Sequence, residues 1–253
     1  MTGWDALRQE LDLWHRTGVQ ARLWWRDDDA RAATVELDQL LTVAQDLPLA
    51  LAVIPVGLDP SLIARMQGMN RVSILPHGYA HTNHEPADRK KAEFGAGRDI
   101  TQAVSELRRS LALLQDAFGD QVFPLFVPPW NRIAPKIADC VADAGLKGVS
   151  TFTDRSPNRR VPGLNTHVDI LDWKAKKKSG HARFLGEEAV LADLVGALAR
   201  RRIVTPDTDG TEAVGLLTHH LEHDQDSWDF LATLVRFIQD HPGVRWISAA
   251  QGL

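Results

Sequence analysis

The sequence is poor in cysteine, in long apolar runs and in excess charge, and each shortage excludes a class of protein. Cys140 is its only cysteine, so an intrachain disulfide and a cysteine-rich zinc site are both excluded. No stretch approaches the roughly 18 consecutive apolar residues that a membrane-spanning helix requires. The net charge of −4 gives no reason to expect nucleic acid as a partner.

The N-terminus also lacks the basic segment and apolar run that mark a signal peptide. We therefore expect a cytoplasmic protein that does not act at a membrane. The composition, 44% hydrophobic and 25% charged over 253 residues, is typical of a globular protein with a large core. It does not indicate an oligomeric state.

Short apolar segments alternate along the chain with segments of helical periodicity. Helices are expected over residues 4–16, 34–46, 60–67, 99–118, 133–144, 187–202 and 228–239. Strands are expected over residues 21–26, 49–54, 72–75, 122–127, 148–152, 168–171, 213–218 and 244–247. This alternation predicts an α/β fold, in which a parallel sheet is covered by helices. Seven or eight units without a linker favour a closed (β/α) barrel in a single domain, residues 1–253, with residues 1–18 as an N-terminal helix packed on it. An open doubly wound sheet is the alternative.

Histidines and carboxylates follow several predicted strands at their C-terminal ends, which a barrel brings to one rim. The first strand ends in Asp27, Asp28 and Asp29, and the third is followed by His77 and His81. Two histidines and one carboxylate of the aspartate run form the ligand set of a catalytic metal that keeps a position for water. A second aspartate could deprotonate that water, and a histidine from another strand could protonate the leaving group. We therefore expect one divalent metal ion as cofactor, with Zn²⁺ as the first candidate.

Five motifs occur in order between about Leu23 and His220. They are Trp25-Arg26-Asp27-Asp28, His77-Gly78-Tyr79-Ala80-His81, Val127-Pro128-Pro129-Trp130, Asp169-Ile170-Leu171-Asp172-Trp173 and Leu216-Leu217-Thr218-His219. Together they resemble the motifs of the NodB-type polysaccharide deacetylases, carbohydrate esterase family 4. The resemblance implies a distorted (β/α) barrel of seven or eight strands and a metal-dependent hydrolase that removes an N-acetyl or related acyl group from an amino sugar or polysaccharide.

The same resemblance implies a role for each matched residue. Asp27 would be the catalytic base, and Asp28, His77 and His81 the metal ligands. His219 would be the catalytic acid, held by Asp172. The residues implied to bind substrate are Pro129, Trp130, Asn131, Arg132 and Trp173.

Some assignments stay open at the level of sequence. Val127 stands where the family carries an arginine that orients the base, and Arg26 and Arg132 are both candidates to replace it. His220 is the alternative to His219, because adjacent residues at a strand end point to opposite sides. His84 is expected to lie outside the ligand set, at the surface or behind the ligands.

The lysine-rich residues 174–178 predict a solvated loop, with a site for an anionic ligand as the alternative. Two further functions compete with deacetylation of a sugar. One is hydrolysis of another small amide by the same metal centre, and the other is a barrel that binds carbohydrate without catalysis. The expected partner in each case is a small molecule or a carbohydrate.

Overall fold

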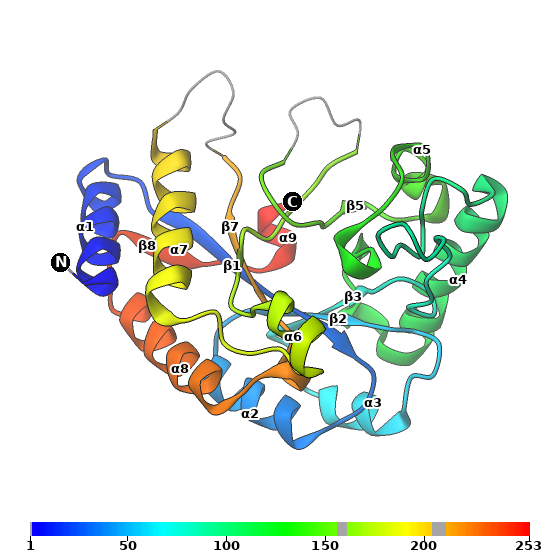
Figure 1. The fold of residues 1–253 in the computed structure, drawn as a ribbon, viewed down its shortest axis with the longest axis horizontal. Coiled ribbons are helices and arrows are strands. Elements are labelled where there is room, and N and C mark those ends of the chain that lie inside the picture. The colour runs from blue at the N-terminus through cyan, green and yellow to red at the C-terminus, as the bar shows by residue number, and fades with distance from the viewer. Residues whose placement is uncertain (1, 156–160, 204–210) are drawn as a thin grey trace.

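Figure 1 shows the computed structural model, which describes residues 2–155, 161–203 and 211–253. The strands are β1 (Ala21–Ala30), β2 (Leu49–Val53), β3 (Val72–Pro76), β4 (Leu125–Phe126), β5 (Gly148–Val149), β6 (Val168–Asp169), β7 (Val214–Thr218) and β8 (Val244–Trp246). The α-helices are α1 (Gly3–Arg16), α2 (Val35–Ala44), α3 (Pro60–Met66), α4 (Ile100–Phe118), α5 (Pro135–Ala138), α6 (Trp173–Ser179), α7 (Glu187–Arg202), α8 (Gln225–Gln239) and α9 (Ala249–Gly252).

In the described part of the chain, six strands form one parallel sheet. Its order is β3-β2-β1-β7-β6, and β8 pairs with the start of β1. The strands β4 and β5 form a separate parallel pair. Isolated parallel bridges join Ile74 to Val122, on the β4 side, and Val149 of β5 to Gly163, which precedes β6. Strands β1 to β7 therefore follow one another in chain order around a distorted barrel, as predicted, and β8 lies beside the start of β1. Among the described residues, no continuous ladder closes the barrel.

Helices α1, α2, α3, α7 and α8 surround one side of the sheet, and α4 and α5 lie beside β4 and β5 (Figure 1). The predicted N-terminal helix packs on this layer, because the Trp4 ring lies 5.1 Å from the Phe237 ring and 5.8 Å from the Phe230 ring. Thr2 caps α1 and shares a capping box with Asp5. Among the described residues, no helix combines the length and hydropathy that crossing a bilayer demands.

Several elements differ from the sequence expectations. The strands expected over 148–152 and 168–171 are reduced to β5 and β6, and α9 was not expected. The strand expected over 122–127 is reduced to β4, because Pro124 and Pro128 have no N–H to donate to a ladder. The helix expected over 133–144 begins only at Pro135 and gives way to a 3₁₀ turn over Val141–Ala144. The expected lysine-rich loop is the helix α6, whose N-cap Asp172 accepts hydrogen bonds from the N–H groups of Lys174 and Ala175.

Candidate metal centre

Three of the expected polar side chains meet at the C-terminal ends of β1 and β3. The Asp29 Oδ1 atom lies 3.0 Å from His77 Nε2 and 3.2 Å from His81 Nε2. These ligand atoms lie within 4.8 Å of one another, which is close enough for all three to bind one ion. The structure thus brings His77 and His81 together as predicted, but the carboxylate beside them belongs to Asp29 and not to Asp28.

The chemistry of these atoms fits a divalent cation. His77 Nδ1 lies 3.1 Å from the Val127 carbonyl oxygen, which can only accept, so Nδ1 carries a proton and donates it. In the neutral ring, the lone pair of Nε2 then faces the Asp29 carboxylate. A histidine that donates its second N–H to a backbone carbonyl is the usual arrangement for a metal ligand.

The two groups shift each other's pKa in opposite directions, and a bound cation would compete with the proton that Asp29 favours on His77 Nε2. Burial alone would raise the pKa of Asp29, but its bonds to His77 and His81 outweigh burial and hold that pKa well below its usual value. Burial alone would lower the pKa of His77, but the Asp29 and Asp28 carboxylates outweigh it and raise that pKa. Asp29 therefore stays ionised, as a metal ligand must.

A bulge in β1 places Asp29 in this position. The register between β1 and β2 shifts between Asp27 and Ala30, and Asp29 has a φ of 73°. In a regular strand, Asp28 and Asp29 would point to opposite faces. Bulges re-aim side chains in this way, and aspartate tolerates the left-handed region better than most residues. Asp28 and Asp29 therefore both lie near His77.

Asp28 lies beside the triad and is paired with Arg26. Both residues are buried; Asp28 Oδ1 lies 2.8 Å from Arg26 Nε, and Asp28 Oδ2 accepts a hydrogen bond of 2.9 Å from Arg26 Nη2. Ser150 and Asn131 fix the guanidinium by accepting further hydrogen bonds of 2.6 Å each. A forked ion pair of this kind holds a carboxylate in one orientation.

The contacts of the two candidate replacements for the missing arginine differ in the structure. Arg26 binds Asp28, whereas Arg132 points elsewhere and donates a hydrogen bond to the Lys91 carbonyl oxygen. The 3₁₀ turn Pro129–Asn131 assists Arg26, because Asn131 belongs to it. Asn131 is thus engaged with Arg26, although the sequence suggested that it binds substrate.

Asp27 points away from the triad and is fully engaged. Its Oδ1 lies 2.5 Å from His220 Nδ1, and its Oδ2 accepts hydrogen bonds from the Thr218 hydroxyl and the His220 N–H. Both Asp27 and His220 are buried. Burial opposes the charged form of Asp27, but the contacts with His220 prevail and lower its pKa. Asp27 therefore ties β1 to β7 and the turn that follows it, on the side away from the triad.

His219 faces the site, while His220 is turned toward Asp27. His219 Nε2 lies 4.0 Å from Asp28 Oδ2, and its ring packs edge-on against Trp173 at 4.6 Å. The structure does not bring Asp172 to His219, because Asp172 caps α6. The carboxylate linked to this region is Asp169, which accepts a hydrogen bond of 2.7 Å from Trp173 Nε1. Burial raises the pKa of Asp169, although the charge of His219 opposes this shift.

Two tryptophans that the sequence suggested for substrate binding flank the site. The Trp130 ring lies 4.5 Å from the His81 ring, and Trp173 packs on His219. Residues 77–84, which follow β3, form what we call the histidine loop. Pro129 is buried against this loop, where its ring would lie 2.5 Å from a Cβ added to Gly78. His84 is exposed and, as expected, has no place in the triad.

Sequence reasoning missed Glu93, which shapes the histidine loop from beneath. It is 1% exposed, and its carboxylate accepts hydrogen bonds from the N–H groups of Tyr79, Ala80 and Thr82. A side chain at Gly78, which has a φ of 65°, would collide with Glu93 Oε2. Only contacts across 11 to 14 residues of chain reveal this role, since no motif surrounds Glu93.

Backbone strain also gathers at the site. Among the described residues, six non-glycine residues have a positive φ, and four of them are Asp29, His81, Trp130 and Asn131. Such conformations cost on the order of 1–3 kcal/mol each and persist where the surroundings enforce them. Their clustering here indicates that the fold holds these side chains for a function.

A second acidic group, Asp154, His167 and Glu212, is a poorer candidate for a metal. Arg201 Nη2 already lies among its members, 2.8 Å from Glu212 Oε2 and 3.1 Å from Asp154 Oδ1. Arg201 Nη2 also lies 2.5 Å from His167 Nε2, so the guanidinium already occupies the position that an ion would take against that nitrogen. The positive charge of the Arg201 guanidinium thus lies where a metal ion would otherwise bind.

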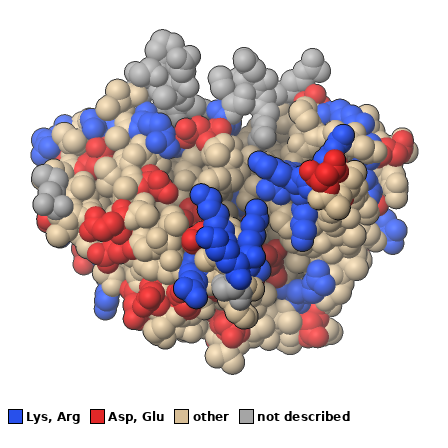
Figure 2. Space-filling model, in the orientation of Figure 1, with Lys and Arg blue, Asp and Glu red and all other residues tan. Residues whose placement is uncertain are grey.

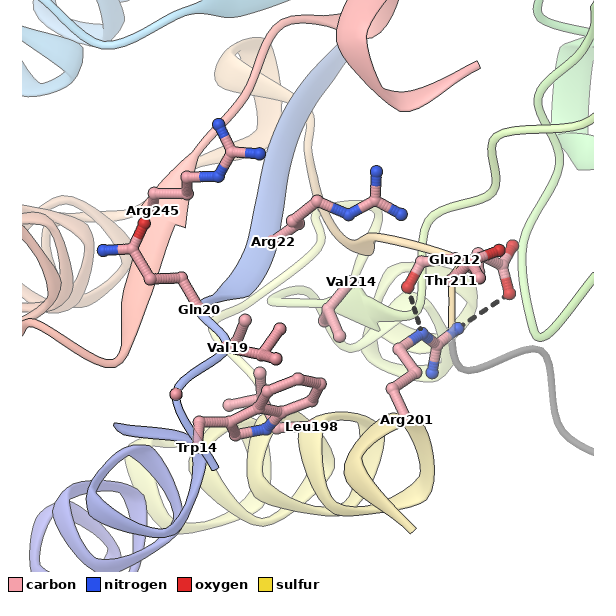
Figure 3. A pocket seen from close by; sticks show the side chains of 12 residues that line it. Trp14, Val19, Gln20, Arg22, Leu198, Arg201, Thr211, Glu212, Val214 and Arg245 are labelled. Atoms are coloured by element: carbon pink, nitrogen blue, oxygen red, sulfur yellow. Dashed lines mark hydrogen bonds and ion pairs between the residues drawn. The ribbon is translucent and has the colours of Figure 1, made fainter. Parts of the chain in front are cut away.

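A pocket of about 630 Å³ lies beside this second group and away from the triad (Figure 3). Its lining includes Arg22 at the start of β1, Val214 at the start of β7 and Arg245 of β8. Asp29 ends the same strand β1 seven residues after Arg22, roughly 20 Å further along. The pocket therefore lies at the opposite ends of the strands from the candidate metal centre.

His223, which follows the 3₁₀ turn His220–Glu222, leads to a prediction about how stability depends on pH. Burial lowers its pKa to about 4, and its ring packs on Trp228 at 4.4 Å. Between pH 6.5 and 4 the unfolded chain binds a proton at this residue and the folded chain does not, so stability falls as the pH falls through this window. Replacing His223 by leucine should remove up to about 3 kcal/mol of that fall. Urea unfolding of both proteins at pH 7 and pH 4.5 measures it, and an unchanged difference would contradict the assignment.

The comparisons with known proteins give a fold but no close relative. No family model and no curated protein matches the sequence. Among solved structures, a family 4 carbohydrate esterase from Streptomyces lividans in complex with acetate is 16% identical, with a TM-score of 0.55 over 92% of this chain and 95% of that chain. A family 4 esterase from Streptococcus mutans is 12% identical, with a TM-score of 0.57 over 98% and 91%.

A family 4 pseudoenzyme from Bacillus anthracis is similar to the same degree. It is 14% identical, with a TM-score of 0.56 over 92% of this chain and 65% of that chain. Esterases and a pseudoenzyme thus share this architecture, so the fold alone does not establish an activity. At these identities the likeness concerns the fold, and the chain has the fold of the family 4 carbohydrate esterases.

Proposed function

We propose that the chain is a metal-dependent hydrolase that removes an N-acyl group, with N-acetyl as the first candidate, from an amino sugar or polysaccharide. The observation that carries the proposal is one constellation at one rim. It comprises the Asp29, His77 and His81 triad, the Asp28 carboxylate held by Arg26, and His219 4.0 Å from Asp28. The fold similarity to deacetylases and esterases supports it.

Asp29, His77 and His81 would hold a divalent ion, for which Zn²⁺ is the first candidate. Such an ion, when bound, acts as a Lewis acid toward an acyl carbonyl and toward water. The resemblance assigned the base to Asp27 and the ligand to Asp28. Because the bulge turns Asp29 toward the histidines, both roles shift by one residue along the chain. We assign the base to Asp28 and the carboxylate ligand to Asp29.

Asp28 is placed to accept the proton of the attacking water, and the forked contact with Arg26 orients its carboxylate. His219 is placed to donate a proton to the nitrogen as the C–N bond breaks and the C–O bond forms. The products are a carboxylic acid and a free amine. Asp169 positions His219 through Trp173, whose N–H binds Asp169 and whose ring packs on His219.

Release of acetate from N-acetylglucosamine oligomers tests the proposal. Treatment with a chelator should lower the rate at least 100-fold, and added Zn²⁺ should restore it. Small linear and cyclic amides tested in parallel decide whether the bond belongs to another substrate class. Acetate release that resists both the chelator and the double substitution His77→Ala, His81→Ala would contradict the proposed centre.

The pseudoenzyme of the same fold makes a non-catalytic carbohydrate-binding barrel the second candidate. It predicts saturable binding of oligosaccharides together with no chelator-sensitive hydrolysis of any amide. A rate that depends on the metal would exclude it.

A further inference from the structure

Each tryptophan beside the candidate centre carries a lysine on its ring. Lys91 Nζ lies 5.8 Å from the centre of the Trp130 ring, and Lys176 Nζ lies 5.3 Å from the centre of the Trp173 ring. Trp130 in turn packs on His81, and Trp173 packs on His219. The site is therefore bordered by a cation on the His81 side and another on the His219 side. These lysines come from segments 85 residues apart in the sequence.

Further basic residues surround both lysines, although the whole chain has a net charge of −4. In the sequence between residues 172 and 186, Asp172 is the only acidic residue. The same segment contains five lysines and arginines: Lys174, Lys176, Lys177, Lys178 and Arg183. Lys91 follows Arg89 and Lys90 directly. Figure 2, in the orientation of Figure 1, shows one group of basic side chains over α6 near the centre and a second group to its right, on the side of α5. We call these two groups the basic rim: Lys174, Lys176, Lys177 and Lys178 on one side, and Lys90 and Lys91 on the other.

Few acids neutralise the basic rim. Lys176 pairs with Glu222 at 2.5 Å, and the Asp172 carboxylate accepts from backbone N–H groups of α6. Among the described residues, no ion pair is found for Lys91, Lys174 or Lys177. Like charges three and four positions apart on a helix, as in Lys174 with Lys177 and Lys178, destabilise it by a few tenths of a kcal/mol per pair. A bound anion would relieve this repulsion.

We propose that the substrate is an acidic glycan, in which sugars that carry a carboxylate flank the N-acylated amino sugar. This inference rests on the proposed function and names its substrate class. A pyranose stacked on Trp130 or Trp173 through its apolar face brings its ring substituents within reach of the ammonium group over that tryptophan. A carboxylate on the stacked sugar would then meet Lys91 on one side and Lys176 on the other. Because a lysine lies on each side of the site, we expect a sugar with a carboxylate on each side of the N-acylated amino sugar.

Two tetrasaccharides test the inference, since both contain N-acetylglucosamine. Chitotetraose is neutral, and the hyaluronan tetrasaccharide alternates N-acetylglucosamine with glucuronate. Binding is measured by tryptophan fluorescence on the full chain at 50 mM and 300 mM salt. We expect hyaluronan tetrasaccharide to bind roughly five- to tenfold tighter at low salt, since each exposed ion pair contributes a few tenths to 1 kcal/mol. High salt should remove most of that preference.

Two variants test whether the basic rim causes the tighter binding of the hyaluronan tetrasaccharide. The double substitution Lys91→Gln, Lys176→Gln should bring the ratio of the two affinities close to one. Lys136→Gln, which changes an exposed lysine of α5 outside the rim, should leave the ratio as in the wild type. Equal binding of the two tetrasaccharides by the wild type, or a preference that survives the double substitution, would overturn the inference.

Acetate release, measured separately, distinguishes this inference from the function on which it rests. If the acidic tetrasaccharide binds preferentially and neither compound releases acetate, the acidic ligand stands and the hydrolase fails. If both release acetate at equal efficiency and bind equally, the hydrolase stands and the acidic substrate class fails.

Discussion

Replacing Asp28 by asparagine is expected to lower turnover by roughly 10²- to 10⁴-fold, the usual contribution of a general base. The amide keeps the shape of the carboxylate but does not accept a proton from water. The metal should stay bound, because the triad consists of Asp29, His77 and His81. Steady-state acetate release and metal content of the same preparation measure both parts.

The matched control is Asp27→Asn, which changes the neighbouring carboxylate on the other face of β1. Asp27 binds Thr218 and His220, so its loss should lower stability more than it lowers the rate of the folded enzyme. The family pattern, applied to the sequence alone, predicts the opposite order. A folded Asp27→Asn protein without activity, beside an active Asp28→Asn protein, would return the role of base to Asp27.

Replacing Arg26 by glutamine is the second change with a large expected effect. Arg26 is fully buried and bound to Asp28, and removal of one partner of a buried ion pair typically costs about 3–5 kcal/mol. Asp28 would also lose the group that orients it, so turnover should fall even where the protein is folded. Urea denaturation measures the first effect, and acetate release below the transition measures the second.

Arg132→Gln is the control for Arg26, because both arginines are candidates at the level of sequence. Within the described ranges, the Arg132 side chain donates its one hydrogen bond to the Lys91 carbonyl oxygen, so its loss should cost less than about 1 kcal/mol. Similar losses of stability from the two substitutions would mean that Arg26 does not replace the missing arginine.

Much of this site follows from the sequence because it depends on strand ends. The apolar segments before Asp27, His77 and His219 predicted strands, and parallel strands in a barrel bring their C-terminal ends to one rim. Alternation along a strand indicated that only one of His219 and His220 could face the site, and the family resemblance favoured His219. The structure places only His219 toward Asp28. These features depend on local periodicity, which a single sequence carries.

The roles within the aspartate run could not be read in the same way. They depend on a bulge that shifts the register of β1 after Asp27 and on a left-handed Asp29. Three consecutive aspartates show no pattern that would place such a bulge. The carboxylate Glu93, which binds the histidine loop, and the pairing of Arg26 with Asn131 both join distant segments, and no local spacing announces them.

Metal content per chain tests the central claim most directly. The wild type, Asp29→Ala and the double variant His77→Ala, His81→Ala are purified identically and reconstituted with Zn²⁺ before elemental analysis. The account predicts about one ion per wild-type chain, a large loss in Asp29→Ala and complete loss in the double variant. Full retention of the ion in Asp29→Ala, or no ion in a folded wild type after reconstitution, would contradict it.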